Sequence, residues 1–301
     1  MSATAAARPS KLQAWRAAAR PPTLTAAVAP VLVGTGLAIR DDAFDGGPAL
    51  AALVGALCIQ VGANFANDVF DYERGADTAD RLGPPRATAT GMLSPREVKT
   101  GMWMVFGLAA LAGVYLAIVG GWPIVAVGVA SIAAAIIYTG GPWPIGYHAL
   151  GDLFTFAFFG LAAVGGTYYV QAGELTWPAL AAAIPAGCTV TAILVVNNLR
   201  DIPTDRATGK RTLAVVMGDG MTRAWFGMLV VVAYVVAFVL WAAGEASPWV
   251  LLTVPAAAAG WPAFRAVFRG VQGAPLNAAL KATARFHLAF GAALALALAL
   301  S

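Results

Sequence analysis

The sequence predicts an all-α membrane protein, a bundle of about nine transmembrane helices. Three observations support this prediction: the composition, a series of apolar runs and the placement of the basic residues. Of the 301 residues, 59% are apolar and 11% are charged, whereas an ordinary soluble domain has roughly 25% charged residues. The 19 basic and 15 acidic residues are too few to cover the surface of a soluble protein of this length.

Nine apolar runs are long enough to cross a bilayer, which takes about 20 predominantly apolar residues. Each run lies between Gly, Pro or charged residues. The last two runs are the least regular, because Pro, Gly and Arg residues within 262–275 interrupt the apolar pattern. We expect residues 1–301 to form a single integral-membrane domain. The predicted spans are 23–39, 48–66, 101–119, 122–138, 151–171, 177–198, 224–243, 247–264 and 283–300.

The connections between the spans indicate the orientation of the chain. Residues 1–22 contain basic residues without an apolar core, so they are predicted to be a cytoplasmic segment and not a removable signal peptide. All but one of the 19 Lys and Arg residues lie in this segment, in the connections after spans two and six, or in the region 265–285 around the start of span nine; the exception is Arg40. Because cytoplasmic loops are enriched in Lys and Arg, we predict a multi-pass protein of the bacterial cytoplasmic membrane. Its N-terminus would face the cytoplasm and Ser301 the outside.

The two long cytoplasmic connections, at about 67–100 and 199–223, are the places where we expect chemistry. External connections such as Gly120–Gly121 are short by comparison. Long connections in compact domains often carry function. The predicted active site therefore faces the cytoplasm.

A cluster of Asn and Asp residues ends span two. Asn64, Asn67, Asp68 and Asp71 follow the spacing i, i+3, i+4 and i+7, which places them on one helical face. Like charges at this spacing repel each other and lose solvation near a membrane, so we expect a cation between them.

The end of span six carries a second cluster of the same kind. Aligning the last Asp of the first cluster with Asp201 superposes the preceding Asn-Asp pair on Asn197-Asn198, which indicates an internal repeat. Asp205 follows one turn later. Because Pro203 lies between the two Asp residues and proline kinks or ends a helix, we expect Asp205 to be less well aligned than Asp201.

Oxygen ligands without His or Cys favour hard cations such as Mg²⁺, which takes few carboxylates and completes its shell with water and substrate phosphates. We therefore predict a diphosphate held through Mg²⁺, with Mn²⁺ as a substitute. The alternative is that these are solvated loop charges, but two matching clusters argue against it. The predicted metal ligands are Asn67, Asp68, Asp71, Asp201 and Asp205.

Basic and amide side chains near the two clusters are candidates for direct contact with the diphosphate, since guanidinium and ammonium groups bind phosphate oxygens. The predicted diphosphate-binding residues are Asn64, Asn67, Arg81, Arg86, Asn197, Asn198, Lys210 and Arg211.

The two clusters resemble the paired Asp-rich motifs of the UbiA superfamily of intramembrane prenyltransferases, and the likeness extends over almost the whole chain. The segments 81–86, 138–144, 151–152 and 197–201 resemble the branch that prenylates 1,4-dihydroxy-2-naphthoate, the MenA enzymes. Many members have a third Asp at the position of Gly75. Here Asp77 follows two residues later, so the resemblance leaves its role open.

This resemblance implies a UbiA-type prenyltransferase fold. It also implies Mg²⁺-dependent transfer of a polyprenyl group from polyprenyl diphosphate to 1,4-dihydroxy-2-naphthoate, with loss of the carboxylate, giving demethylmenaquinone in menaquinone biosynthesis. Mg²⁺ and cationic side chains would stabilise the leaving diphosphate. We expect membrane lipid as a further contact, and neither nucleic acid nor an obligatory protein partner.

Tyr138 and Asp152 flank the short connection between spans four and five and are predicted to bind the acceptor. Tyr138 would also donate to the diphosphate, and Asp152 would orient or deprotonate an acceptor hydroxyl. The alternatives are an interfacial aromatic anchor for Tyr138 and a helix N-cap for Asp152. The predicted catalytic residues are Asp68, Asp71, Asp152, Asp201 and Asp205.

Other functions remain as alternatives. A UbiA-type enzyme with another acceptor would use 4-hydroxybenzoate, homogentisate or a phosphoribosyl compound. A secondary transporter would place its carboxylates near the middle of the bilayer, whereas the predicted spans have their Asp residues at the ends. A CDP-alcohol phosphotransferase would need a compact Asp-Gly-x-x-Ala-Arg segment, which does not occur.

Overall fold

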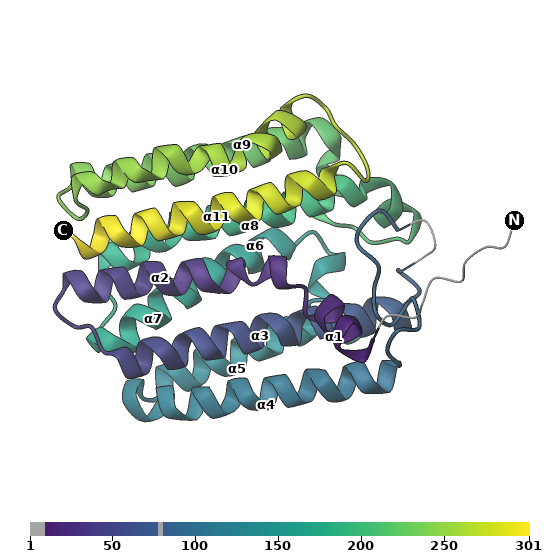
Figure 1. Cartoon of the computed structure of the whole chain (residues 1–301), viewed down its shortest axis with the longest axis horizontal. Helices are drawn as coiled ribbons and strands as arrows, with labels where there is room; N and C mark the ends of the chain where they lie inside the picture. Colours follow the sequence, from purple (N-terminus) through teal and green to yellow (C-terminus); the bar gives the residue numbers. More distant parts are fainter. Residues whose placement is uncertain (1–9, 78–80) are drawn as a thin grey trace, which may run out of the picture.

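Long helices lie side by side along the long axis of the molecule (Figure 1). The computed structural model describes residues 10–77 and 81–301. The first nine residues of the predicted N-terminal segment, and residues 78–80 of the first long connection, lie outside the described residues. The C-terminus and helix α1 (Lys11–Ala19) lie at opposite ends of the bundle.

The first half of the chain forms one side of the bundle. A Ser10–Gln13 capping box starts α1, which continues through a short 3₁₀ turn and a bend of 46° into α2. The capping box of Ser94 and Glu97, with Pro95 at the first helical position, starts α4. The helices that follow α1 are α2 (Thr25–Arg40), α3 (Gly46–Glu73), α4 (Pro95–Gly120) and α5 (Trp122–Ile137).

The second half completes the bundle. A span that begins as α6 passes through a π-helical segment into α7, where Gly173 ends it in a left-handed conformation. A 3₁₀ turn, Pro248–Leu252, precedes α10. The elements are α6 (Gly151–Thr155), the π-helical segment (Phe156–Ala162), α7 (Ala163–Ala172), α8 (Trp177–Ala207), α9 (Leu213–Ala242), α10 (Thr253–Phe268) and α11 (Leu276–Ala299).

The helices are compatible with the prediction of about nine spans. Seven helical segments among the described residues are long and apolar enough to cross a membrane, and the bent pair of α1 and α2 makes an eighth. The ninth predicted span is the shorter apolar helix α5. Each of the nine predicted runs coincides with one of these segments, so the chain is an integral membrane protein.

Both long connections are shorter than predicted because the helices continue into them. Helix α3 extends to Glu73 and α4 begins at Pro95, which leaves 74–94. The second connection contracts to 208–212, since α8 runs to Ala207 and α9 starts at Leu213. Thr212 is the N-cap of α9, and its hydroxyl accepts a hydrogen bond from the Val215 amide. Some of the charged residues that the sequence analysis assigned to the connections therefore lie in the terminal turns of the helices.

The expectation that Pro203 disturbs the second cluster was wrong. Helix α8 includes Pro203 as an internal residue and continues for another turn. Proline removes one backbone donor and usually kinks a helix. Here the helix still presents Asp201 and Asp205 to the same cavity.

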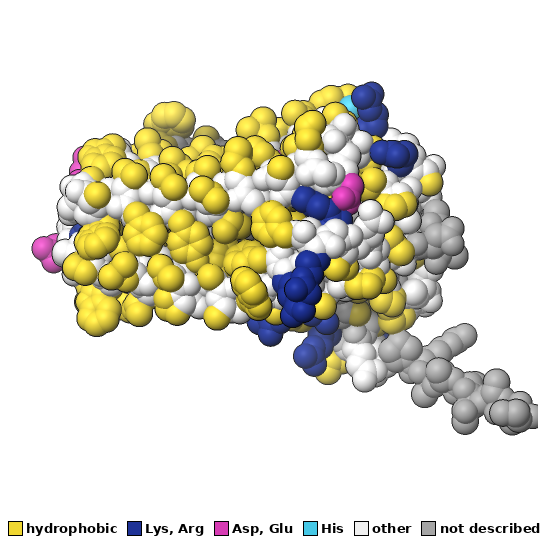
Figure 2. Space-filling model, turned by 90° about the horizontal axis from the view of Figure 1, so that it is seen from above, with side chains coloured by type: hydrophobic (Ala, Val, Ile, Leu, Met, Phe, Trp, Pro, Cys, Tyr) yellow, Lys and Arg dark blue, Asp and Glu magenta, His cyan; other side chains and the backbone are white. Residues whose placement is uncertain are grey.

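The exterior is apolar around the middle of the bundle. Figure 2 shows hydrophobic side chains covering most of one face, with Lys and Arg side chains gathered toward the end where α1 lies. Large exposed apolar residues include Trp103, Leu111, Ile118 and Trp261. Such a surface is suited to lipid and not to water.

The connections 138–150 and 208–212 and the described parts of 74–94 lie at the same end of the bundle as α1, and we refer to this end as the motif end. The main core packs α8 and α11 against α2 and α9, and a smaller core joins α1, α3 and α4. Between these two cores the bundle encloses a cavity.

Candidate active site

A cavity of about 550 Å³ lies between helices α2, α3, α4, α5, α7 and α8. At the motif end its wall contains Asn and Asp residues from both clusters, though not Asp68, and farther in it is lined mainly by Ala, Val, Ile, Leu and Phe. A single cavity therefore has a charged end and an apolar end.

The first cluster contributes Asn67 and Asp71 to the cavity wall. The Asn67 amide oxygen accepts a hydrogen bond of 3.0 Å from the Thr139 hydroxyl. The Asp71 carboxylate accepts one of 3.1 Å from Arg86 Nη2 and one of 2.9 Å from Tyr147 Oη. Asp71 is therefore held between the first connection and the 138–150 connection.

Asp68 does not line the cavity, although the sequence placed it on the same face. It is only 1% exposed, and its two carboxylate oxygens accept hydrogen bonds of 3.0 and 2.9 Å from the amides of Ala87 and Thr88. A residue one position from Asn67 is turned by about 100° around the helix, which directs Asp68 to the first connection. In this structure Asp68 anchors that connection.

Asp77, whose role the sequence left open, belongs to the charged end of the cavity. Its carboxylate pairs with Arg81 and lies 3.5 Å from Arg86 Nε. Burial raises the pKa of Asp77 to about 6; the positive charge of Arg81 opposes this shift and the negative charge of Asp71 adds to it. Asp77 thus holds two of the predicted diphosphate-binding cations.

The second cluster lines the cavity with Asn197, Asn198, Asp201 and Asp205, all from α8. It faces the first cluster across the charged end. The two predicted clusters are therefore brought together, as the internal repeat suggested.

Arg200 is the principal residue of this region that the sequence analysis did not select. Its side chain is 1% exposed, and its Nε and Nη2 donate to the two carboxylate oxygens of Asp201 at 2.7 and 2.5 Å. Nη2 also donates to Asn197 Oδ1 at 2.9 Å. A buried Arg directly before an Asp at a span end is a signal for such a pair, but sequence cannot distinguish it from a topology-setting charge.

The predicted cations separate into two groups. Arg81, Arg86 and Lys210 line the cavity. Arg211 is exposed, and its backbone instead pairs with Tyr147 and Ala149. Arg20, which the sequence analysis counted only as a topological charge, lines the cavity. Its buried Nη2 has no hydrogen-bond partner among residues 10–77 and 81–301.

Tyr147 was also missed, because nothing in the sequence distinguishes it from the other tyrosines of the chain. The backbone pairing with Arg211 fixes its position, and the Lys210 ammonium lies 5.2 Å from its ring centroid. Burial and the carboxylate of Asp71 raise the pKa of Tyr147 above its ordinary value. The phenol therefore keeps its proton and acts as a donor.

The two predicted acceptor-binding residues have different surroundings. Tyr138 lines the cavity. Asp152 is buried outside it, beside a small void, and accepts a hydrogen bond of 2.9 Å from Trp225 Nε1. Asp152 therefore shares this void with Asn198 but does not line the main cavity.

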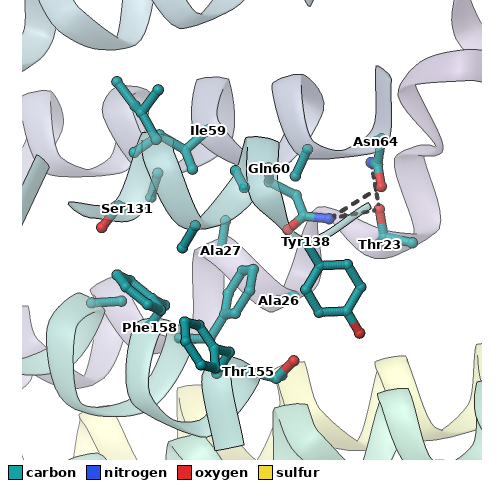
Figure 3. A pocket seen from close by; sticks show the side chains of 18 of the residues that line it. Thr23, Ala26, Ala27, Ile59, Gln60, Asn64, Ser131, Tyr138, Thr155 and Phe158 are labelled. Carbon is teal, nitrogen blue, oxygen red and sulfur yellow. Dashed lines mark hydrogen bonds between the residues drawn. The ribbon is translucent and has the colours of Figure 1, made fainter. Parts of the chain in front are cut away.

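A polar group interrupts the apolar wall beside Tyr138 (Figure 3). Asn64 Nδ2 and Gln60 Nε2 donate to the Thr23 hydroxyl at 2.9 and 3.2 Å. Asn64 also donates to the Ala19 carbonyl, which ties α3 to the bend between α1 and α2. The Asn64 amide nitrogen is thus engaged by Thr23 and Ala19. Phe158, from the π-helical segment, lies across the cavity from Gln60.

The sequence profile of the UbiA prenyltransferase family matches residues 27–299. The chain belongs to the UbiA prenyltransferase family. Its prenyltransferase relatives include the 1,4-dihydroxy-2-naphthoate octaprenyltransferase of Mycobacterium tuberculosis, 42% identical over 95% of this chain and 96% of that protein. The protein of the same name from Bacillus subtilis is 34% identical over 94% of this chain and 91% of that one.

Solved UbiA structures share the fold. A UbiA homologue from Aeropyrum pernix has a TM-score of 0.68 at 14% identity, over 90% of this chain and 94% of that one. A UbiA homologue from Archaeoglobus fulgidus, described as bound to GPP and Mg²⁺, has a TM-score of 0.60 at 14% identity and covers 75% of this chain and 77% of that one. At this identity the likeness supports the fold.

Proposed function

We propose that this UbiA-family chain transfers a polyprenyl group from polyprenyl diphosphate to 1,4-dihydroxy-2-naphthoate. The observation that carries the proposal is the single cavity with two Asn/Asp clusters facing each other at one end and an apolar wall beyond them. An isoprenoid diphosphate matches this arrangement, because its diphosphate head is charged and its isoprenoid tail is apolar. The relatives named for the naphthoate reaction support the choice of acceptor.

The charged end suits a divalent cation. Asn67, Asp71, Asn197, Asp201 and Asp205 offer oxygen ligands, and the described residues lining the cavity include neither His nor Cys. Such a set selects hard cations such as Mg²⁺. Within the described residues, no three acidic, His or Cys side chains are grouped closely enough to hold an ion by themselves. Diphosphate and water oxygens would therefore complete the coordination.

When bound, Mg²⁺ would neutralise charge that develops on the leaving diphosphate. The chain's own donors act on the same charge. Arg81, Arg86 and Lys210 are available to bind phosphate oxygens, whereas the hydroxyl of Tyr147 donates to Asp71 and orients that carboxylate. Because these groups lie in a largely buried site, their effect on the departing diphosphate is stronger than it would be in water.

Bond cleavage takes the C–O electron pair to the diphosphate and leaves an allylic cation. The apolar wall keeps water from this cation, and Phe158 presents an aromatic ring to the same space. The new C–C bond then forms at an electron-rich carbon of the dihydroxynaphthoate ring. Loss of the carboxylate as CO₂ leaves its bonding electron pair with the ring, and with no net change in the number of ring protons this gives the reduced form of demethylmenaquinone.

The acceptor would lie between the charged end and the apolar end, next to Tyr138. The Thr23, Gln60 and Asn64 side chains offer hydrogen bonds there to a hydroxyl or carboxylate. Asp152 is omitted from this proposed acceptor site, since its carboxylate binds Trp225 outside the cavity.

We further propose that the motif end faces the cytoplasm of a bacterial cell, because nearly all of the Lys and Arg residues lie on that side of the predicted spans. Single cysteines introduced at exposed Arg269 and at Ala243, in a background lacking Cys58 and Cys188, test this orientation. A membrane-impermeant maleimide added to intact cells should label position 243 and spare position 269.

The proposed reaction is tested by assaying the purified protein in detergent with Mg²⁺ and one polyprenyl diphosphate. 1,4-Dihydroxy-2-naphthoate and 4-hydroxybenzoate are offered side by side, with homogentisate as a third acceptor. A prenylated, decarboxylated naphthoate product is expected. Preference for another acceptor would overturn the naphthoate assignment and retain prenyl transfer, whereas the absence of any prenylated product would overturn both.

A further inference from the structure

A chain of polar contacts connects α11 to the first connection through Asn277. Arg200 Nη1 donates to Asn277 Oδ1 at 2.7 Å. Asn277 Nδ2 in turn donates to the Leu82 carbonyl oxygen at 2.8 Å. Asn277 therefore bridges the second acidic helix and the segment that carries Arg81 and Arg86.

The chemistry of the two partners determines how the Asn277 amide is oriented. A guanidinium group has only donors and a backbone carbonyl has only acceptors. The oxygen of Asn277 must face Arg200, and its nitrogen must face Leu82. Aspartate would keep the contact with Arg200 but would set a carboxylate oxygen against the Leu82 carbonyl, so asparagine is the residue of this size that satisfies both.

Gly83 provides a second, independent contact at the same place. A Cβ atom at this position would stand 2.9 Å from Arg200 Nη2 and 3.2 Å from Arg200 Cζ. Four hydrogen bonds hold the Arg200 guanidinium in place, to Asp201, Asn197 and Asn277. The backbone of the first connection thus rests directly on a fixed guanidinium group.

The first connection is attached to both acidic clusters as a result. Arg86 binds Asp71 of the first cluster, and Leu82 and Gly83 contact the Arg200–Asn277 pair beside the second. The cation Arg81 directly precedes Leu82 in the chain and lines the cavity. A shift of the connection away from α8 would move Arg81 relative to Asp201.

We propose that Asn277 is a positioning residue that ties the first connection to α8 and thereby sets the affinity for the prenyl diphosphate head group. This inference rests on the proposed function for the identity of the ligand. It assigns to α11, which contributes only Leu280 to the cavity wall, a role in diphosphate binding.

The test compares Asn277→Ala and Asn277→Asp with the unaltered protein, all purified in detergent. Binding of geranyl diphosphate in the presence of Mg²⁺ is measured by calorimetry, and KM for geranyl diphosphate, KM for the acceptor and kcat are measured in the prenyl transfer assay. Asn277→Ala removes both side-chain hydrogen bonds and Asn277→Asp removes the one to Leu82, so each variant should raise Kd and KM for the diphosphate by roughly three- to tenfold. The KM for the acceptor should stay within a factor of about two.

Thr283→Val is the matched control, because Thr283 is buried on the same helix and donates only to the Ala279 carbonyl. It should leave the diphosphate Kd unchanged. Gly83→Ala should raise this Kd as Asn277→Ala does. The double variant should show less than the product of the two single effects, since both act through Arg200.

Hydrogen exchange of residues 81–93 gives a readout that does not depend on catalysis. Asn277→Asp should speed exchange in this segment, and Thr283→Val should not. Unchanged exchange together with an unchanged diphosphate Kd would overturn the inference. A fall in kcat and thermal stability without a change in KM would also overturn it, because that pattern indicates only a packing role. If the unaltered protein binds no geranyl diphosphate, the proposed function fails, and the exchange data alone decide whether Asn277 ties the connection.

Discussion

Tyr147 donates a hydrogen bond of 2.9 Å to Asp71 across 76 residues of sequence. The bond joins the 138–150 connection to the end of α3 at the charged end of the cavity. It orients one carboxylate oxygen of Asp71 while Arg86 binds the other.

Replacing Tyr147 by Phe should therefore weaken prenyl transfer. The variant loses one donor to a buried carboxylate, which predicts a fall of about tenfold in kcat/KM for the prenyl diphosphate. Steady-state assays with varied diphosphate measure this effect. The control is Tyr72→Phe, since Tyr72 is 42% exposed. Equal activity of the two variants would contradict the role of the hydrogen bond.

Asp71→Asn and Asp201→Asn should each lower Mg²⁺-dependent turnover by about a hundredfold or more, because each removes a negative oxygen ligand from the charged end. Thermal melting in detergent should show that both variants stay folded. Asp219→Asn is the matched control: Asp219 pairs with Arg223 and does not line the cavity. Near-normal turnover by either cavity variant would remove that residue from the proposed site.

Chelation should abolish turnover. Treatment with EDTA would remove the divalent cation that the Asn and Asp residues of the cavity would hold, and added Mg²⁺ should restore the rate. Product formation is followed by chromatography, and addition of Mn²⁺ tests the expected substitution. Full activity in excess EDTA would rule out a dissociable metal in the reaction.

Asp68→Asn should behave differently from Asp71→Asn. Its carboxylate accepts two backbone amide hydrogen bonds outside the cavity. An asparagine can accept only at its single oxygen, so the variant should lose about 1–3 kcal/mol of stability and should melt at a lower temperature. Turnover per folded molecule should stay within about threefold. A stable but inactive Asp68→Asn protein would show that the carboxylate acts on the substrate, as the sequence suggested.

Asp152→Asn separates two accounts of this residue. If Asp152 binds the acceptor, this substitution should raise the KM for dihydroxynaphthoate. The structure instead predicts an unchanged KM and a melting temperature close to that of the unaltered protein, since an Asn oxygen can still accept the hydrogen bond from the Trp225 indole outside the cavity. Trp225→Phe removes this donor and should lower the melting temperature. A selective rise in the acceptor KM would return Asp152 to the acceptor site.

Periodicity and composition predicted the bundle closely, because the demands of the bilayer are local. Every predicted span coincides with a helix, including 122–138, which forms the short α5 (Trp122–Ile137). The limits of the connections were less accurate. Helix α8 continues to Ala207, and α9 starts at Leu213 with Thr212 as its N-cap. Both helices therefore extend into the segment predicted as loop.

The sequence by itself determined the class of protein, the two Asn/Asp clusters and their shared end of the bundle. Apolar run length and the spacing of residues along one helix are properties that a linear chain carries. It could not decide between Asp68 and Asp71, which lie three residues apart on the same helix. The tertiary structure decided this, because the amides of Ala87 and Thr88 approach one side of α3 and the cavity opens on another. In the same way, the contacts of Tyr147 and Asn277 depend on connections that meet only in the folded bundle.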